Sequence, residues 1–526
     1  MSAYPTTLKS RAESALTDPH FDFIATYHAV ADLRRLAVQH PGLLDGDTIF
    51  ALRRLLTSGA FGKVRQAYFL FREAASVMTD MAAGPGGPGA IALASLGDLL
   101  IETRGSAHRG VAEALGSLPL NIKGPDRHHR QQSFSRAMAW PDLLAVNQLE
   151  TDGPPRYIGR SLVVRVANSK RLLVVKLARA GDTAAGLEKE IRWMETLRQA
   201  RYAADCRFHI PVPVISGRHR IIRLRQLPLP PPGTLRFHPD RLAIAFLAHR
   251  DYFVYPNHPG IDGAAACEIL GRNAYLLGRL AGEGIIHDAP IALFHNRTQR
   301  LRRDDQGRYQ WFRAGRLDRW LDSCAFPNFG RSGLRDFEHL ISFQADSRML
   351  YRHIGSHLFS LLLVAGSHFR GRDAARVGLD GSGAPVDARD LFDHELLAAM
   401  IRQVYQGYYL GFSGSPPAPR PPVDLDRLVA RMIAEMGVDR HMTELLRRVD
   451  QQALTDREFH DFLTERGYPP ERIARLQRGA KDILISSGPH LGHFNRQISL
   501  PELIECVAGM SAVCIAGRFV AQRKFP

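Results

Sequence analysis

A lysine stands inside the most strand-like segment of this sequence, the run RLLVVKLARA at residues 171–180. The chain has 69 lysine and arginine residues, and only eight of them are lysines. Lys176 therefore has two interpretations. Its stem lies along an edge strand with the ammonium in water, or the ammonium faces an anionic group such as a phosphate.

A helical segment follows this lysine closely. Residues 186–200, GLEKEIRWMETLRQA, have helical spacing of apolar residues and carry glutamates 12 and 14 residues after Lys176. A glutamate on this helix would hold the lysine by an ion pair. Glu190 fits the expected position best, and Glu188, which points to a different helix face, is the alternative.

Further polar residues that could do chemistry lie in the second half of the chain. An amphipathic helix, a glycine-containing break and a short apolar strand lead to His287 and Asp288. Asn328 and Asp336 follow, the latter in the triplet Asp-Phe-Glu. Asparagine and aspartate oxygens are ligands that Mg²⁺ prefers. The alternative is that Asp336 is the N-terminal residue of a helix over FEHLISF.

The order of these features resembles the two-lobed plan of protein kinases, in which a strand lysine and a helix glutamate hold the phosphates of ATP. Two departures stand out. No asparagine follows Asp288 at a spacing of five residues, as the kinase catalytic loop requires. The glycine-rich phosphate loop is also missing, and upstream of Lys176 only Gly159 stands, between Arg156 and Arg160.

The lysine, the glutamate 14 residues later, the long insertion after His287, and the spacing of Asn328 and Asp336 resemble the SidJ-type pseudokinases. The resemblance covers about residues 157–412. It implies a kinase-like fold that adenylylates a carboxylate of a protein substrate and then joins a free glutamate to it. It also implies the site residues: Lys176, Glu190, Asn328 and Asp336 for Mg-ATP, Arg160 for phosphate, and His287 and Arg316 for a second nucleotide pocket.

The expected cofactors are thus ATP and Mg²⁺, and the expected partner is a protein substrate. An activating protein is a further expectation, although the C-terminal helical region has no I-Q pair, which argues against calmodulin. Two alternatives remain open. Asp288 could orient a hydroxyl for ordinary phosphoryl transfer, or the protein could be a nucleotide-binding scaffold without catalysis.

Composition narrows the classes of protein. The net charge of +16 suits an anionic partner, but the arginines are scattered and form no basic block, so nucleic acid is not favoured. The five cysteines are far apart, which argues against a zinc site or a disulfide framework. The start of the sequence does not resemble a signal peptide, and the longest apolar runs, at 358–366 and 506–517, are shorter than a membrane span. We expect a cytoplasmic protein, with export as an effector still open.

The predicted fold class is α+β, a bilobal kinase-like core flanked by helical units. Residues 1–125 have helical spacing, and two similar stretches 44 residues apart suggest HEAT-type repeats. Period-two runs joined by Asn168-Ser169-Lys170 predict a hairpin within a linker and small lobe at 126–232. Residues 233–412 are predicted to be a mainly helical large lobe. A proline-rich spacer then precedes a C-terminal helical unit at 424–526.

Overall fold

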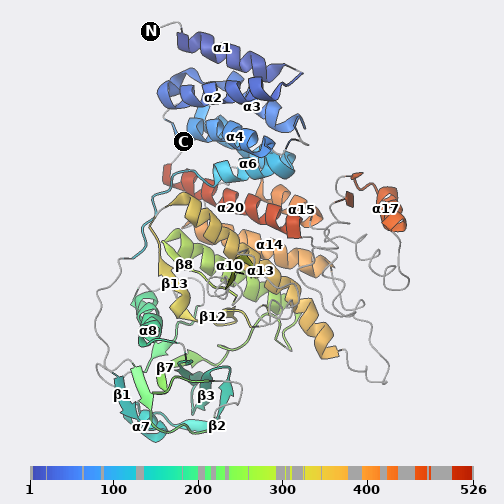
Figure 1. Cartoon of the computed structure of the whole chain (residues 1–526). Helices are drawn as coiled ribbons and strands as arrows, with labels where there is room; N and C mark the ends of the chain where they lie inside the picture. The colour runs from blue at the N-terminus through green and yellow to red at the C-terminus, as the bar shows by residue number, and fades with distance from the viewer. Residues whose placement is uncertain are drawn as a thin grey trace.

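A computed structural model describes most of the chain, and its described residues alternate with gaps. It describes residues 4–125, 135–291, 302–303, 309–310, 324–376, 394–414, 423–435, 456–474 and 500–523. Within these ranges, the longer interruptions are at 200–207, 215–220 and 231–235, and single residues or short breaks are left out elsewhere. The protein is mixed α and β, with a long column of helices and one curled sheet at its end (Figure 1).

The first part of the chain forms a stack of helices, with α1 at the end that carries the N-terminus (Figure 1). The caps follow the sequence: Asp22 accepts a hydrogen bond from the amide of Ala25, and Asp45 begins a capping box with Thr48. The helices are α1 (Tyr4–Thr17), α2 (Phe23–Gln39), the 3₁₀ helix η1 (Pro41–Leu43), α3 (Gly46–Thr57), α4 (Ala67–Ala83), α5 (Pro88–Glu102) and α6 (Gly105–Leu115).

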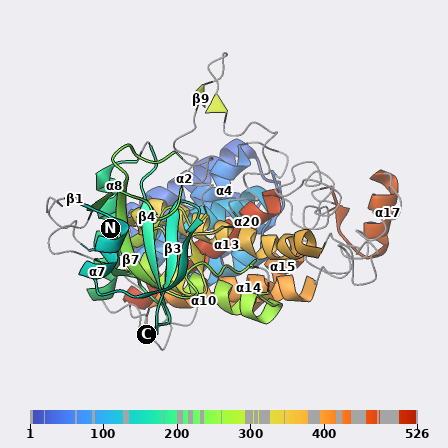
Figure 2. The same cartoon turned by 90° about the horizontal axis from the view of Figure 1, so that it is seen from below.

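The sheet follows. Its strands are β1 (Ser135–Met138), β2 (Thr151–Ile158), β3 (Ser161–Val166), β4 (Arg171–Leu177), β5 (Val212–Pro213), β6 (Ile221–Leu224) and β7 (Leu242–His249). The order is β1-β6-β7-β4-β3-β2, with β5 also paired to β7. In Figure 2, β7, β4 and β3 lie side by side. Only the β1–β6 pair is parallel among the described strands.

The hairpin predicted around residues 168–170 is confirmed. Strands β3 and β4 are antiparallel, and Lys176 lies opposite Ser161 in their register. Asn168 in the turn has φ of +53°, a left-handed conformation that asparagine tolerates better than most residues. Two helices accompany the sheet: α7 (Trp140–Val146) and α8 (Ala184–Gln199), which corresponds to the helix predicted at 186–200.

Strand β7 differs from the prediction that the chain is mainly helical after residue 233. It is the partner of β4 along seven residue pairs, from Arg171 opposite His249 to Leu177 opposite Ala243. Its sequence, LAIAFLAH, is a continuous apolar run because most of the strand is buried on both faces. Such a run has no period of two and cannot be distinguished from a buried helix by periodicity.

The second half combines long helices with short strands. The long helices are α10 (Gly263–Gly282), α13 (Ser347–Arg376), α14 (His394–Ser413), α15 (Leu425–Glu435), α17 (Asp456–Glu465) and α20 (Leu500–Arg523). Two antiparallel strand pairs lie among them, β8 (Ile285–His287) with β13 (Leu340–Ser342), and β11 (Phe329–Gly330) with β12 (Gly333–Leu334). The remaining short elements are β9 (Arg302–Arg303), β10 (Tyr309–Gln310) and the 3₁₀ helix η2 (Phe337–His339).

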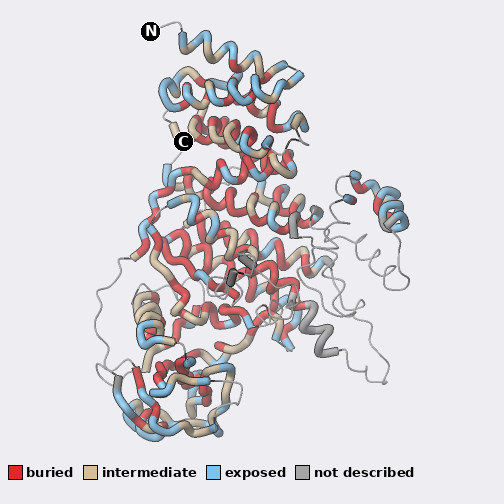
Figure 3. Tube along the Cα trace, viewed as in Figure 1, coloured by how far each residue is buried: buried red, intermediate tan, exposed pale blue. Residues whose placement is uncertain are grey.

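Helix α20 packs between the N-terminal helices and the helices of the second half. It packs against α6 on one side and against α13 and α14 on the other, so one apolar core runs from α1 to α20 (Figures 1 and 3). Its residues Leu503–Arg523 are long and apolar enough to cross a membrane, although the apolar runs read from the sequence were shorter. However, 72% of that apolar window is buried inside the protein, as expected for a core helix.

Candidate functional site

Lys176 lies at the centre of a buried charge cluster between the sheet and the short strands of the second half. Strands β3 and β7 flank it, and its side chain is only 4% exposed. The ammonium lies 2.7 Å from Glu190 Oε2, 2.8 Å from Asp336 Oδ1 and 3.6 Å from Glu338 Oε1. Of the two interpretations of this lysine, the one in which the ammonium faces anionic groups therefore agrees with the structure.

Glu190, and not Glu188, is the glutamate of α8 that meets the lysine. Glu190 is fully buried, whereas Glu188 is half-buried on the same helix. Burial is the main reason that the pKa of Glu190 is raised to about 7; the charge of Lys176 lowers this pKa, and the carboxylates of Glu338 and Asp336 raise it. Glu190 is therefore an acceptor for the ammonium of Lys176 inside the core.

Asp336 follows the β11–β12 hairpin in an uncommon backbone conformation. Its φ of +50° is left-handed, which a non-glycine residue adopts only when the surrounding structure enforces it. Burial alone would raise the pKa of this carboxyl, but the charges of Lys176 and then Arg335 hold the pKa far below its usual range. Asp336 is followed by η2 and β13, so the helix that FEHLISF could have formed is not present.

Arg335, which the sequence did not indicate, is a second cation whose charge acts on Asp336. Its guanidinium lies 5.1 Å from the ring centre of Tyr252, 4.7 Å from that of Phe253 and 5.0 Å from that of Tyr255, and it donates to the Tyr255 hydroxyl. A cation enclosed by three aromatic faces is held in a fixed place. The positive charge beside Asp336 is thus built into the apolar core.

Arg160 ties the β2–β3 turn to the same cluster. Gly159 and Arg160 close the turn between Ile158 and Ser161, and Gly159 has φ of +55°. The guanidinium of Arg160 donates to Glu338 Oε1 at 2.6 Å and to Asp182 Oδ2 at 2.5 Å. The β2–β3 turn, which stands upstream of Lys176, is thus short, and it presents a side-chain cation.

Glu338 and His339 are site residues that sequence reasoning missed. With Asp336 they form a group whose ligand atoms all lie within 4.8 Å of one another, a spacing that a metal ion could bridge. Their signal was the triplet Asp-Phe-Glu followed by histidine, which places three ligating residues within four positions. Phe337 between them is buried and stacks on Phe208 at 6.2 Å between ring centres.

His287 positions the backbone beside Asp336. Its Nε2 lies 2.9 Å from the Arg335 carbonyl oxygen, and burial lowers its pKa to about 4. A neutral imidazole can bond a carbonyl only through its N–H, so the proton sits on Nε2. His287 therefore acts on the main chain of the site.

A second buried histidine, His357 on α13, supports the first. Its Nε2 lies 2.8 Å from the carbonyl oxygen of His287, and its Nδ1 lies 2.8 Å from the Tyr408 hydroxyl. Burial lowers its pKa to about 3, so it is neutral and donates from Nε2, while Tyr408 donates to Nδ1. The pair of histidines links helices α13 and α14 to the site.

Asp288 also reaches the cluster. Its Oδ1 lies 3.3 Å from His339 Nδ1, and its amide donates to the His339 carbonyl at 2.9 Å. Burial alone would raise the pKa of Asp288, but the hydrogen bond from His339 lowers it below its usual value. A partly exposed carboxylate thus stands next to the group that could hold a metal.

Asn328 holds the loop that leads to Asp336. Its side-chain amide donates to the Ala289 carbonyl at 2.9 Å, and its backbone oxygen accepts from the Arg335 amide at 2.8 Å. This brings Asn328 next to the His287–Asp288 loop and to the start of the Asp336 turn. Arg316, predicted for a second nucleotide pocket, lies outside the described residues.

Comparison with known proteins adds no family name. No protein-family model and no curated protein matches the chain.

Proposed function

We propose that this protein is a kinase-like enzyme of the SidJ kind, which binds Mg-ATP and transfers AMP to a carboxylate of a protein substrate, leading to glutamylation. The observation that carries the proposal is the position of the Lys176 ammonium between Glu190 and Asp336, at 2.7 and 2.8 Å. In protein kinases a strand lysine paired with a helix glutamate holds the α- and β-phosphates, and a following aspartate binds the metal.

The order of elements supports this proposal. The strand that carries the lysine and the helix that carries the glutamate precede β7, the last strand of the sheet. A connector of irregular structure, 250–262, leads from β7 to α10 and then to the short strands around Asp288 and Asp336. The charge cluster lies where these two parts meet, which is the place that the two-lobed plan gives to the nucleotide.

The charges of the cluster fit a divalent cation. Four carboxylates, Glu190, Asp336, Glu338 and Asp182, gather around three cations, which are Lys176, Arg160 and the Arg335 that stands beside Asp336. Asp336 and Glu338 would hold Mg²⁺, with Asn328 nearby, because carboxylate and amide oxygens are its usual ligands. The bound ion would neutralise charge on the phosphates of the nucleotide.

The residues of the chain divide the remaining work. Lys176 and Arg160 would contact the phosphate oxygens and stabilise the charge that develops in transfer. An oxygen of the acceptor carboxylate bonds the α-phosphorus, the bond to the β-phosphate oxygen breaks, and pyrophosphate leaves. The amino group of glutamate then attacks the acyl carbon of the mixed anhydride, releasing a proton and AMP. Arg335, His287 and His357 would keep Asp336 in place.

The test uses the full chain with Mg²⁺ and ATP labelled on either the α- or the γ-phosphate, with and without glutamate and a cell lysate. Label retained from the α-position, or AMP and pyrophosphate formed when glutamate is added, supports the proposal. Protein-bound γ-label contradicts AMP transfer. Asp336→Asn should abolish both Mg-dependent binding and turnover, and asparagine keeps the left-handed backbone accessible.

Matched controls separate the site from general effects. Lys176→Ala should abolish ATP binding, whereas Lys170→Ala changes an exposed lysine of the β3–β4 turn and should leave it intact. Likewise, Glu190→Gln should weaken binding and Glu188→Gln on the same helix should not. Binding of Mg-ATP that survives Lys176→Ala together with Asp336→Ala would overturn the proposal.

Two other functions remain as alternatives. Ordinary phosphoryl transfer is favoured by Asp288, which stands 3.3 Å from His339 beside the carboxylate group and could orient a hydroxyl. In that case Asp288→Asn abolishes transfer of the γ-phosphate. A scaffold without catalysis would show a thermal shift with ATP and no product with either label.

We further propose that the protein works in the cytoplasm. The cysteines that the structure describes, Cys267, Cys324, Cys506 and Cys514, form no disulfide. This supports a reducing compartment such as the cytoplasm. The protein substrate and any activating protein would be met there, or in the cytoplasm of another cell if the protein is exported.

A further inference from the structure

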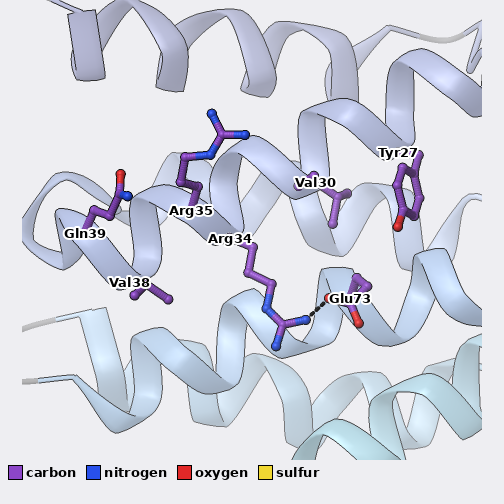
Figure 4. A pocket seen from close by; sticks show the side chains of 8 residues that line it. Tyr27, Val30, Arg34, Arg35, Val38, Gln39 and Glu73 are labelled. Atoms are coloured by element: carbon purple, nitrogen blue, oxygen red, sulfur yellow. Dashed lines mark ion pairs between the residues drawn. The ribbon is translucent and has the colours of Figure 1, made fainter.

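A groove crosses the helical part of the molecule, away from the charge cluster. Its main cavity, of about 370 Å³, lies between α2 and α4 and is lined by Tyr27, Val30, Ala31, Arg34, Arg35, Val38, Gln39 and Glu73. Figure 4 shows Arg34 of α2 reaching to Glu73 of α4. Tyr27 and Val38 lie at the two ends of the cavity in this view. An adjoining cavity of about 170 Å³ shares Arg34 and Glu73.

The adjoining cavity continues the groove onto α6 and α13. It is lined by Glu113, Ala114, Gly116 and Ser117 at the end of α6, and by Arg348, Tyr351 and Arg352 at the start of α13. A side chain on Gly116 would collide with the ring of Tyr351, so the two helices meet too closely there for anything but glycine. The groove is therefore one continuous surface built from helices of both halves of the chain.

The rim of the groove carries uncompensated positive charge. Arg348 and Arg352 are exposed, and neither of them makes an ion pair within the part of the chain that the structure describes. Arg35 is also exposed, and its contact with Asp32 is long, at 3.8 Å. Exposed arginines along one groove attract an acidic ligand.

The groove also has an apolar side. Tyr27 is 44% exposed and Val38 is 72% exposed, and Phe69 on α4 is 53% exposed near the same face. The floor carries Glu73 and Glu113, which would repel a continuous row of phosphates. This mixture favours a polypeptide with spaced carboxylates and apolar side chains over nucleic acid.

We propose that this groove binds an acidic peptide segment of a partner protein. Aspartate or glutamate side chains of the segment pair with Arg35, Arg348 and Arg352. Its apolar residues lie against Tyr27 and Val38. The proposal does not depend on ATP binding, because the groove shares no residue with the charge cluster around Lys176.

Fluorescence anisotropy with the full chain tests this inference. The probe is a short fluorescein-labelled peptide in which glutamates alternate with leucine and phenylalanine. Its controls are the same peptide with glutamine in place of glutamate, and a labelled single-stranded oligothymidine. We expect saturable binding of the acidic peptide that weakens with added salt. The glutamine peptide should bind at least about tenfold more weakly.

Variants place the binding in the groove. Arg348→Glu together with Arg352→Glu should weaken the acidic peptide about tenfold or more, and Val38→Asp should weaken it as well. Arg11→Glu, an exposed arginine of α1 outside the groove, is the matched control and should bind as the unchanged protein does. The proposal is overturned if the double variant binds the peptide with unchanged affinity, or if the oligothymidine binds more tightly than the peptide.

Discussion

The ammonium of Lys176 lies 2.8 Å from the carboxylate of Asp336, although the two residues are 160 positions apart in the chain. One comes from the C-terminal end of β4 and the other from the turn after β12. Because Glu190 takes the other side of the same ammonium, Lys176 connects the sheet, helix α8 and the second half of the molecule.

The first prediction concerns the stability of this connection. Lys176→Met leaves Glu190 buried without its cation, which should lower the free energy of unfolding by about 3–5 kcal/mol. Glu190→Gln in the Lys176→Met background should cost clearly less than in the unchanged protein, since its charge no longer has a partner. Urea unfolding of the two single variants and the double variant measures the coupling. Additive losses would mean that the two side chains do not interact.

The second prediction concerns His357. His357→Phe leaves the Tyr408 hydroxyl and the His287 carbonyl without their buried partner, and each orphaned group costs roughly 1–3 kcal/mol. Tyr408→Phe leaves only one group without a partner, the Nδ1 acceptor of His357, and should cost about half as much. Chemical denaturation compares the two. Equal losses would show that the bond to His287 contributes nothing.

The third prediction is a loss of stability in acid. Burial lowers the pKa of His108 to about 3, of His287 to about 4 and of His357 to about 3, from 6.5 in an unfolded chain. The unfolded chain therefore binds more protons between these values, so the stability is fully present above pH 6.5 and is lost as the pH falls. Each histidine contributes a slope of about 1.4 kcal/mol per pH unit.

Measuring the free energy of unfolding between about pH 7.5 and about pH 5 checks this prediction. His108→Leu should make the dependence shallower, because His108 then no longer titrates. Its Nε2 bonds the Glu505 carbonyl at 3.1 Å, so this variant also loses some stability at neutral pH. A slope unchanged by the substitution would mean that His108 is not buried in its neutral form.

The fourth prediction concerns the packing of α10 on α14. A side chain on Gly411 would collide with the backbone oxygen of Tyr275, which cannot move aside. Gly411→Ala should therefore destabilise the protein by about 1–3 kcal/mol. Gly186→Ala in α8 is the control: nothing lies within 4 Å, and alanine should stabilise that helix by roughly 0.5–1 kcal/mol. Thermal unfolding of both variants measures the difference, and an unchanged melting temperature for Gly411→Ala would contradict the prediction.

Much of the local structure was readable from the sequence. The β3–β4 hairpin, the helix bearing Glu190, and the strand leading to His287 all have local signals, because turn residues and apolar periodicity depend on near neighbours. Strand β7 was not, since a segment buried on both faces has no alternation. The site residues Glu338, His339 and Arg335 were missed because their roles depend on partners far along the chain.

The sequence by itself determined which side chains could do chemistry, namely a rare lysine, the candidate glutamates after it and the Asp-Phe-Glu triplet. Only the tertiary structure decided that Glu190 rather than Glu188 meets Lys176, and that Glu338 joins them. The physical reason is that ion pairing acts over a few ångströms in space. The spacing of residues in the chain does not fix that distance until the sheet, α8 and the β11–β12 turn pack together.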